Sequence, residues 1–303
     1  MRRILVLRGG ALGDFIVTLP ALALLRQRWP DARLELVGNA TAATLVPAGG
    51  LLDAVHSQHE ARWAALFGDD PLPDGFQRWL ANFDLVVNYW PDADGSLGRR
   101  FPARDGQQFL SASAMPSRAP AAAHYCAPLL SLGLETRNFF CGLDDGLVIP
   151  GAVPSRNEAV RRGNIVALHP GSGSPQKNWP LDRWRTLAAW IKHAHGAALL
   201  IISGEAEPPD ALGHLGRHAR NLPLPELARE LSQCRLFLGH DSGVSHLAAA
   251  CGVPGILLFG PTDPVMWAPP APHVTVIRRG PDVASISLAD VQAAVTKALA
   301  DQT

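Results

Sequence analysis

Residues 239–264 read GHDSGVSHLAAACGVPGILLFGPTDP and indicate the fold class of this chain most clearly. An apolar run ends at the first polar turn, and a helical pattern follows in which Val244 and Leu247 share one face. Gly252 and Pro254 end that helix, and the apolar run GILLFG then predicts a buried parallel strand. Strand, helix and strand in this order are typical of an α/β fold.

Ser242 stands just before this helix, and its role has two interpretations. The unpaired N–H groups and the dipole of a helix N-terminus favour an anion, so a phosphate-bearing ligand is the functional interpretation. A serine at this position also caps a helix and contributes about 1 kcal/mol without any ligand. Taken alone, the stretch favours the simple cap.

Composition limits the classes of protein that the chain can represent. Its 303 residues exceed the usual size of a single core, which predicts two domains. The 27 basic and 27 acidic residues cancel, so the bulk charge does not indicate a nucleic-acid-binding protein. Four cysteines without a Cys-x-x-Cys pair indicate a reduced, cytosolic protein. The apolar run at the N-terminus is too short for a signal peptide and predicts a first strand instead.

Strand patterns alternate with helical patterns in both halves of the chain, which predicts two parallel-sheet domains. Residues 150–163 are polar and contain proline and glycine, so the boundary is expected there. We therefore predict domains at 1–153 and 154–285, followed by a helical segment at 286–303. A helix is predicted from Asp14 to Trp29, and Pro20 inside it indicates a late start or a kink.

The glycine-rich turn RGGALGD, residues 8–14, follows the first strand. Its spacing does not match a dinucleotide fingerprint, and it has no Walker lysine. Asp14 stands at the start of the following helix. It is either a helix cap or a general base presented to the space between the domains.

Residues 169–180, HPGSGSPQKNWP, follow the first strand of the second half. Lys177 could reach a phosphate from this loop, and an anion site and a plain loop are equally favoured. Glu205, after the next strand, either hydrogen-bonds a ribose hydroxyl or is solvated. His246 lies one helical turn after Ser242 and is either a ligand contact or structural.

Two classes of active site are disfavoured by motif spacing. His240, Asp241 and Ser242 are consecutive, whereas the members of a hydrolytic triad converge from separate elements, so a serine hydrolase is rejected. The sequence also contains no metal-ligand motif of histidines, cysteines or paired carboxylates. The loops that remain all follow strands, where open α/β folds bind ligands.

Three segments together resemble a known family: GDFIVTLPAL near the start, HPGSGSPQKNWP at mid-chain, and residues 239–264. They are similar to the heptosyltransferase-type enzymes of glycosyltransferase family 9, which act in bacterial lipopolysaccharide assembly. The resemblance covers nearly the whole chain, with a loose match from about 40 to 150. It implies an α/β fold of GT-B architecture: two Rossmann-like parallel-sheet domains facing across a cleft, with the C-terminal helix packing back on the first domain.

The resemblance also implies site residues. Asp14 matches the catalytic aspartate of the family and Lys177 its phosphate-binding lysine. Gly173 departs from the pattern, because the family has a hydroxyl residue there. Four residues are expected on the acceptor side, although a solvated basic loop is the simpler interpretation of the arginines: Gly13, Arg62, Arg99 and Arg100. Residues expected to bind the donor are Ser172, Gly173, Lys177, Glu205, Leu222, Asp241, Ser242, Gly243 and His246.

The activity implied is an inverting, metal-independent transfer of a heptose-type sugar. The donor is an ADP-sugar, no further cofactor is needed, and the acceptor is a lipid-linked saccharide of the lipopolysaccharide-core type. A cytoplasmic enzyme at the inner face of the inner membrane is then expected. The resemblance also reverses the interpretation of Ser242, now favouring a diphosphate site.

Three alternatives remain beside this function. The chain could use another nucleotide-sugar or acceptor. It could instead be a non-catalytic nucleotide-sugar-binding protein, but pure binding needs no base at Asp14. An NAD-type oxidoreductase is disfavoured, because the dinucleotide fingerprint fails.

Overall fold

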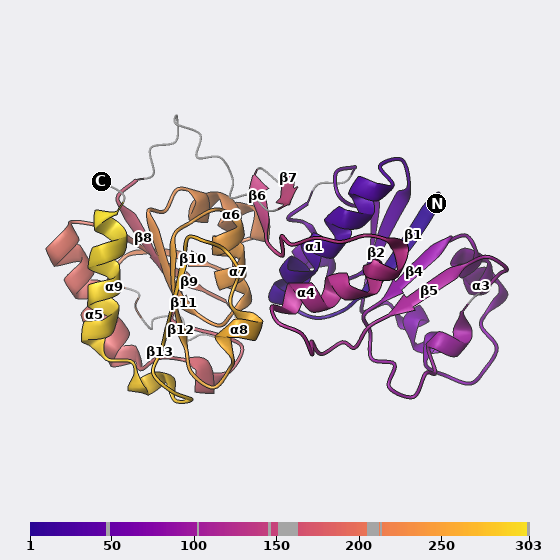
Figure 1. Ribbon diagram of the computed structural model, residues 1–303. Helices are drawn as coiled ribbons and strands as arrows, with labels where there is room; N and C mark the ends of the chain where they lie inside the picture. The colour runs from indigo at the N-terminus through magenta and orange to yellow at the C-terminus, as the bar shows by residue number, and fades with distance from the viewer. Residues whose placement is uncertain are drawn as a thin grey trace. The chain divides into compact units, whose positions relative to one another are not determined.

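The computed structural model describes residues 1–46, 49–101, 103–144, 147–150, 163–204, 212 and 214–301. It separates into two compact units (Figure 1), Met1–Cys141 with Gly146–Pro150 and Gly142–Asp145 with Gly151–Thr303. Most of the predicted boundary region, 150–163, lies outside the described residues, so the boundary at 153 stays a prediction.

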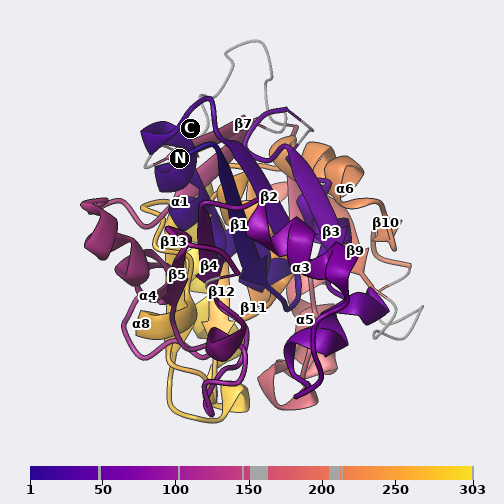
Figure 2. The same ribbon diagram turned by 90° about the vertical axis from the view of Figure 1, so that its right-hand side faces the viewer.

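The first unit is built on a parallel sheet. Its five strands, counted over the described residues, lie in the order β3-β2-β1-β4-β5, and Figure 2 shows β1 to β3 side by side. Two further strands, β6 (Cys141–Asp144) and β7 (Leu147–Pro150), pair with each other and were not predicted. In chain order, the elements that precede β6 are β1 (Arg3–Arg8), α1 (Leu12–Arg28), β2 (Arg33–Gly38), α2 (Ala40–Ala43), β3 (Ala54–Ser57), η1 (Ala61–Leu66), α3 (Asp74–Ala81), β4 (Leu85–Asn88), η2 (Gly98–Arg100), β5 (Gln108–Ser111), α4 (Ala121–Cys126) and η3 (Ala127–Leu132).

Strand β1 is the centre of this sheet, and its side chains from Ile4 to Leu7 are buried on both faces. Leu5 and Leu7 face an aromatic-rich cluster that includes side chains of η1 and α3. On α1, ten residues between Phe15 and Leu25 are buried, and this helix packs against α4. The helix starts at Leu12, earlier than predicted, so Pro20 lies in its interior and does not delay its start.

The second unit is built on a larger parallel sheet. Six strands of its described part lie in the order β10-β9-β8-β11-β12-β13. Strand β10 was not predicted, because its sequence RHAR is basic and lacks an apolar run. The elements are β8 (Ile165–Leu168), η4 (Pro175–Lys177), α5 (Leu181–His195), β9 (Ala198–Ser203), β10 (Arg217–Arg220), α6 (Leu224–Ser232), β11 (Leu236–His240), α7 (Gly243–Ala250), β12 (Gly255–Phe259), α8 (Pro264–Trp267), β13 (Val274–Arg278), η5 (Val283–Ser285) and α9 (Leu288–Ala300).

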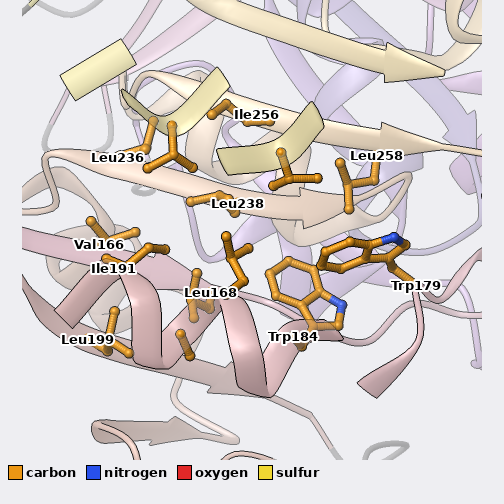
Figure 3. Close-up of a cluster of buried hydrophobic side chains, with 14 of the residues drawn as sticks. Val166, Leu168, Trp179, Trp184, Ile191, Leu199, Leu236, Leu238, Ile256 and Leu258 are labelled. Atoms are coloured by element: carbon orange, nitrogen blue, oxygen red, sulfur yellow. The ribbon is translucent and has the colours of Figure 1, made fainter. Parts of the chain in front are cut away.

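Alternate residues of β8, β9, β11 and β12 form one buried cluster with α5, α9 and two tryptophans (Figure 3). The rings of Trp179 and Trp184 meet edge to face, with centroids 5.5 Å apart. We expected the C-terminal helix to pack back on the first domain. Val291, Val295 and Leu299 form the apolar stripe of α9 and are buried in this cluster of the second unit, beside α5 (Figure 1). The return of this helix to the first domain stays a prediction.

Strand order reverses once in each sheet. From β1 the chain continues outward to β2 and β3, and it returns to the other side of β1 for β4 and β5. The same reversal separates β8 from β11 in the second sheet. Open α/β sheets bind ligands outside the carboxyl ends of the strands at such a reversal. The loops after β1 and β4, and those after β8 and β11, are therefore the places to look for a site.

Among the helices that the structure describes, none combines the length and the apolar character needed to cross a membrane.

Candidate active site

In the second unit, the loop after β8 and the turn after β11 bring two predicted residues together. The Nζ atom of Lys177 lies 2.6 Å from Oδ2 of Asp241, although 64 residues separate them. The lysine side chain is 29% exposed and the aspartate side chain 11%, so the pair is open to solvent on the lysine side. The structure thus places a cation and a carboxylate at the reversal between β8 and β11.

Ser172 shapes the loop that carries Lys177. Its hydroxyl donates to Oδ1 of Asn178 at 2.6 Å and to the carbonyl of Ser174 at 2.8 Å, the two being alternative acceptors for one proton. Gly173, the departure from the family pattern, is exposed. A Cβ atom built on it would meet nothing within 4 Å, so a side chain has room there.

His240 connects this loop to the sheet. Its Nε2 accepts a hydrogen bond from the backbone N–H of Trp179 at 2.8 Å, so the ring proton is on Nδ1, which faces the carbonyl of Gly171 at 3.4 Å. The side chain is fully buried, and this burial lowers the pKa of His240 from 6.5 to about 3. A neutral histidine therefore ties the loop after β8 to the last residue of β11. The sequence analysis considered His240 only as a member of a hydrolytic triad and did not predict this structural role.

Ser242 is the N-cap of α7, as the simpler interpretation predicted. Its Oγ accepts from the N–H of Ser245 at 3.3 Å and lies 3.3 Å from Nδ1 of His169. Ser245 in turn donates to the carbonyl of His240. The N–H groups of Gly243 and Val244 belong to the first turn, which has no intrahelical acceptors. The cap and an anion site are compatible, because capping uses the N–H of Ser245 and neither of these two donors.

The remaining donor-site predictions have different outcomes. His246 lies on α7 and is 7% exposed, and Leu222 is half-buried just before α6. Glu205 lies outside the described residues, so its ribose contact stays a prediction. No structural observation tests the ligand contacts of these three residues.

In the first unit, Asp14 is the third residue of α1 and accepts two hydrogen bonds. Its Oδ2 accepts from the N–H of Ala11 at 2.8 Å, and its Oδ1 accepts from Nη2 of Arg8 at 2.7 Å. The Asp14 side chain is 33% exposed, whereas that of Arg8 is 7% exposed. Asp14 thus stabilises the helix start and still presents a carboxylate to solvent.

Arg8 was missed in the sequence, although an arginine at the end of a buried strand is a usable signal. Its Nη2 also donates to the hydroxyl of Tyr125 at 2.9 Å, and its Nε donates to Oγ1 of Thr18 at 3.2 Å. Burial raises the pKa of Tyr125, so this hydroxyl remains protonated and donates to the carbonyl of Ala114. Arg8 is therefore held in one position and places its positive charge at Asp14.

Gly10 allows the turn before Asp14 to close. Its φ of +114° lies outside the range of residues with side chains, and a Cβ atom there would overlap the Asp14 carboxyl group. The turn is anchored from Gln58, whose Oε1 accepts from the Gly10 N–H at 2.9 Å, and from Asn39, which donates to the Gly10 carbonyl. The glycine-rich turn thus positions a carboxylate.

Each of the predicted acceptor-side arginines already has partners within the first unit. The Arg62 guanidinium pairs with Glu60 at 2.9 Å, donates to Nδ1 of His56, and lies over the Trp63 ring. Arg99 and Arg100 each donate to a backbone carbonyl, and Gly13 lies in the first turn of α1. Their acceptor role stays a prediction.

Within the described ranges, no three His, Cys, Asp or Glu side chains are grouped so that they could hold a metal ion. This finding leaves the predicted independence from metal untested.

A model of the family described as glycosyltransferase family 9 (heptosyltransferase) matches residues 149–291, the part of the chain that carries Lys177 and Asp241. This part of the chain is a glycosyltransferase family 9 domain. It is 23% identical over 285 residues to lipopolysaccharide heptosyltransferase 3 of Escherichia coli K12, covering 85% of this enzyme and 82% of that relative.

Solved structures show the same fold. A family 9 glycosyl transferase from Veillonella parvula is similar with a TM-score of 0.75 and 20% identity, covering 99% of this chain and 97% of the other. The E. coli heptosyltransferase WaaC, solved with ADP, has a TM-score of 0.72 and 18% identity, covering 98% and 99%. These likenesses show the fold, two parallel-sheet domains as in the GT-B architecture. The family match and the relatives show that the chain is a glycosyltransferase.

Proposed function

We propose that the enzyme transfers a heptose from ADP-heptose to a saccharide of the lipopolysaccharide core, with inversion and without a metal ion. The observation that carries this proposal is the Lys177–Asp241 pair beside the capped N-terminus of α7. The names of the relatives support the sugar and the acceptor class, and the ADP in the WaaC structure supports the nucleotide.

The second unit supplies the groups that a diphosphate-linked sugar needs. Lys177 is a cation with an exposed side, and the first-turn N–H groups of α7 add the positive end of a helix dipole. The carboxylate of Asp241 accepts hydrogen bonds from sugar hydroxyls. These groups stabilise the charge that develops on the leaving ADP, which is the task that a metal ion performs in other transferases.

Asp14 is the general base of the proposed reaction. The acceptor oxygen forms a bond to the anomeric carbon, and the bond from that carbon to the diphosphate oxygen breaks, so ADP leaves with the electron pair. The hydroxyl proton moves to Asp14. Both oxygens of this carboxylate already accept one hydrogen bond, and each has a further lone pair for the hydroxyl.

The first experiment mixes the purified enzyme with ADP-heptose and a deacylated lipopolysaccharide-core oligosaccharide. We expect ADP release that depends on the oligosaccharide, undiminished in excess EDTA, and a product whose new anomeric centre is inverted by NMR. Loss of activity in EDTA that a divalent ion restores contradicts metal independence. Tight binding of ADP-heptose without transfer or hydrolysis supports the non-catalytic alternative instead.

The second experiment compares Asp14→Asn with Asp31→Asn, a matched change at an exposed aspartate. Asparagine has one acceptor oxygen for Arg8 or Ala11, and its NH2 group loses the other bond, so a small loss of stability is expected. The ADP affinity should stay intact, because the donor groups belong to the second unit. Turnover should fall about 10²- to 10⁴-fold for Asp14→Asn, the usual contribution of a general base, and not for Asp31→Asn. Full turnover by Asp14→Asn excludes it as the base.

A further inference from the structure

A pair of stacked aromatic rings, one of them exposed, lies beside the turn of Asp14. Phe67 follows η1, and Trp90 follows β4, so both lie beyond the carboxyl ends of strands in the first sheet. Their rings are stacked, with centroids 5.9 Å apart and planes at 29°. Phe67 is 46% exposed and Trp90 is 8% exposed, so the ring of Phe67 provides the exposed face. We call this pair the Phe67–Trp90 shelf.

The shelf is continuous with the turn that positions Asp14. A Cβ atom on Gly9 would lie 3.1 Å from Nε1 of Trp90, so the edge of the indole ring packs directly on the glycine backbone. The next residue, Gly10, contacts the carboxyl group of Asp14 in the same way. Two residues without side chains therefore connect the shelf to the candidate base, and a ligand on the shelf can reach the carboxylate.

Packing and hydrogen bonds in the first unit hold Trp90, the buried ring of the shelf, in place. Trp90 packs edge to face on Trp63 at 6.1 Å, and the indole N–H of Trp63 donates to the carbonyl of Ser57 at 2.7 Å. The backbone N–H of Trp90 donates to Oδ1 of the buried Asn88 at 2.9 Å. A preorganised aromatic surface loses little conformational entropy when it binds a ligand.

The surroundings of the shelf indicate the chemistry of its ligand. The indole N–H of Trp90 and the amide of Gln58, whose oxygen already accepts from the Gly10 N–H, form a polar rim next to the rings. The Arg62 guanidinium is already paired with Glu60 and hydrogen-bonded to His56. An aromatic face with a polar rim fits a sugar ring, which has an apolar C–H face and hydroxyls at its edge. An aromatic face of this kind fits an acyl chain less well, because an acyl chain cannot form hydrogen bonds with the polar rim.

We propose that the Phe67–Trp90 shelf binds the sugar ring of the acceptor that carries the reacting hydroxyl. The inference rests on the proposed function, since an acceptor is required only if the enzyme transfers a sugar. Aromatic stacking would then hold the acceptor at Asp14, in addition to the four acceptor-side residues predicted from the sequence.

The test measures acceptor kinetics of Phe67→Ala and of the conservative Phe67→Trp, with the deacylated core oligosaccharide as the acceptor. Loss of one aromatic stacking contact should raise the acceptor KM about five- to tenfold in Phe67→Ala, and Phe67→Trp should restore it. The kcat and the affinity for ADP-heptose should stay within twofold of wild type. Leu130→Ala, a change at another exposed apolar residue of the first unit (48% exposed), is the matched control and should change nothing.

Each other outcome contradicts one specific claim. An unchanged acceptor KM in Phe67→Ala overturns the shelf while heptose transfer by the wild type stands. A KM increase seen only with an acylated acceptor overturns it as well, because the ring then contacts lipid. If the wild type transfers no heptose, the proposed function fails. Saturation-transfer NMR of the same oligosaccharide then still tests the shelf, which requires binding by wild type and its loss in Phe67→Ala.

Discussion

His240 provides a prediction whose size follows from the structure. Its Nε2 must be unprotonated to accept the hydrogen bond from Trp179, and burial lowers the pKa of His240 to about 3. The substitution His240→Gln replaces it with an amide whose oxygen can accept the same hydrogen bond but does not titrate. The comparison therefore isolates the pH dependence that this one ring contributes to stability.

The direction follows from proton linkage. In the unfolded chain the ring has its ordinary pKa of 6.5, so below this pH the unfolded state binds a proton that the native state does not. The stabilisation is complete above pH 6.5 and decreases as the pH falls toward 3. Between pH 7 and pH 5 the loss amounts to about 2 kcal/mol. Despite its burial, hydrogen bonds from His56 and two arginines lower the pKa of Glu35 from 4.5 to about 2, so this carboxyl group makes stability depend on pH mainly below this window, and equally in both proteins.

The assay is urea unfolding of the full chain at pH 7, 6 and 5. Wild type should lose about 2 kcal/mol more unfolding free energy across this range than His240→Gln, because only wild type has the titrating ring. The matched control His214→Gln, at an exposed histidine of the same unit, should follow wild type. Equal losses in wild type and His240→Gln would refute the buried, neutral ring and its role in holding the loop.

Three further predictions concern the two loops. Gly10→Ala should lower the free energy of unfolding by about 2–3 kcal/mol, because its φ is +114° and its Cβ atom overlaps Asp14. Gly133→Ala, also at positive φ but in open space, should cost about 1 kcal/mol in urea unfolding, and equal costs contradict the overlap. Lys177→Met should weaken ADP binding at least about tenfold by calorimetry, since a charged hydrogen bond is lost; unchanged affinity would remove Lys177 from the donor site. Gly173→Ser should lower the donor KM about threefold in initial-rate kinetics, since it adds a hydroxyl where there is room, and a higher KM would argue against this.

Most strands and helices near the site were predictable. Glycine, proline and polar residues mark where β1, β8 and β11 end, and the apolar periodicity of α5 and α7 is local in the chain. The same local signals placed Asp14, Lys177 and Ser242 at strand ends. A basic edge strand such as β10 has no apolar run and gives no such signal. The predicted start of α1 was two residues too late, because glycines flank the residues of its first turn.

The partners of these residues depend on strand order, which no local pattern encodes. Lys177 meets Asp241 because β8 lies next to β11, and their separation in sequence is 64 residues. Arg8 reaches Tyr125 across 117 residues because α4 packs on α1.

The sequence therefore determined the fold class, the family and the residue types at the strand ends, since these depend on short-range periodicity and turn chemistry. Only the tertiary structure decided three contacts. Arg8 pairs with Asp14, His240 accepts a hydrogen bond from the loop that carries Lys177, and Phe67 stacks on Trp90. The physical reason is that each of these contacts joins segments whose distance is set by the packing of sheets and helices. A side chain's charge, protonation and exposure follow from those neighbours and not from its position in the chain.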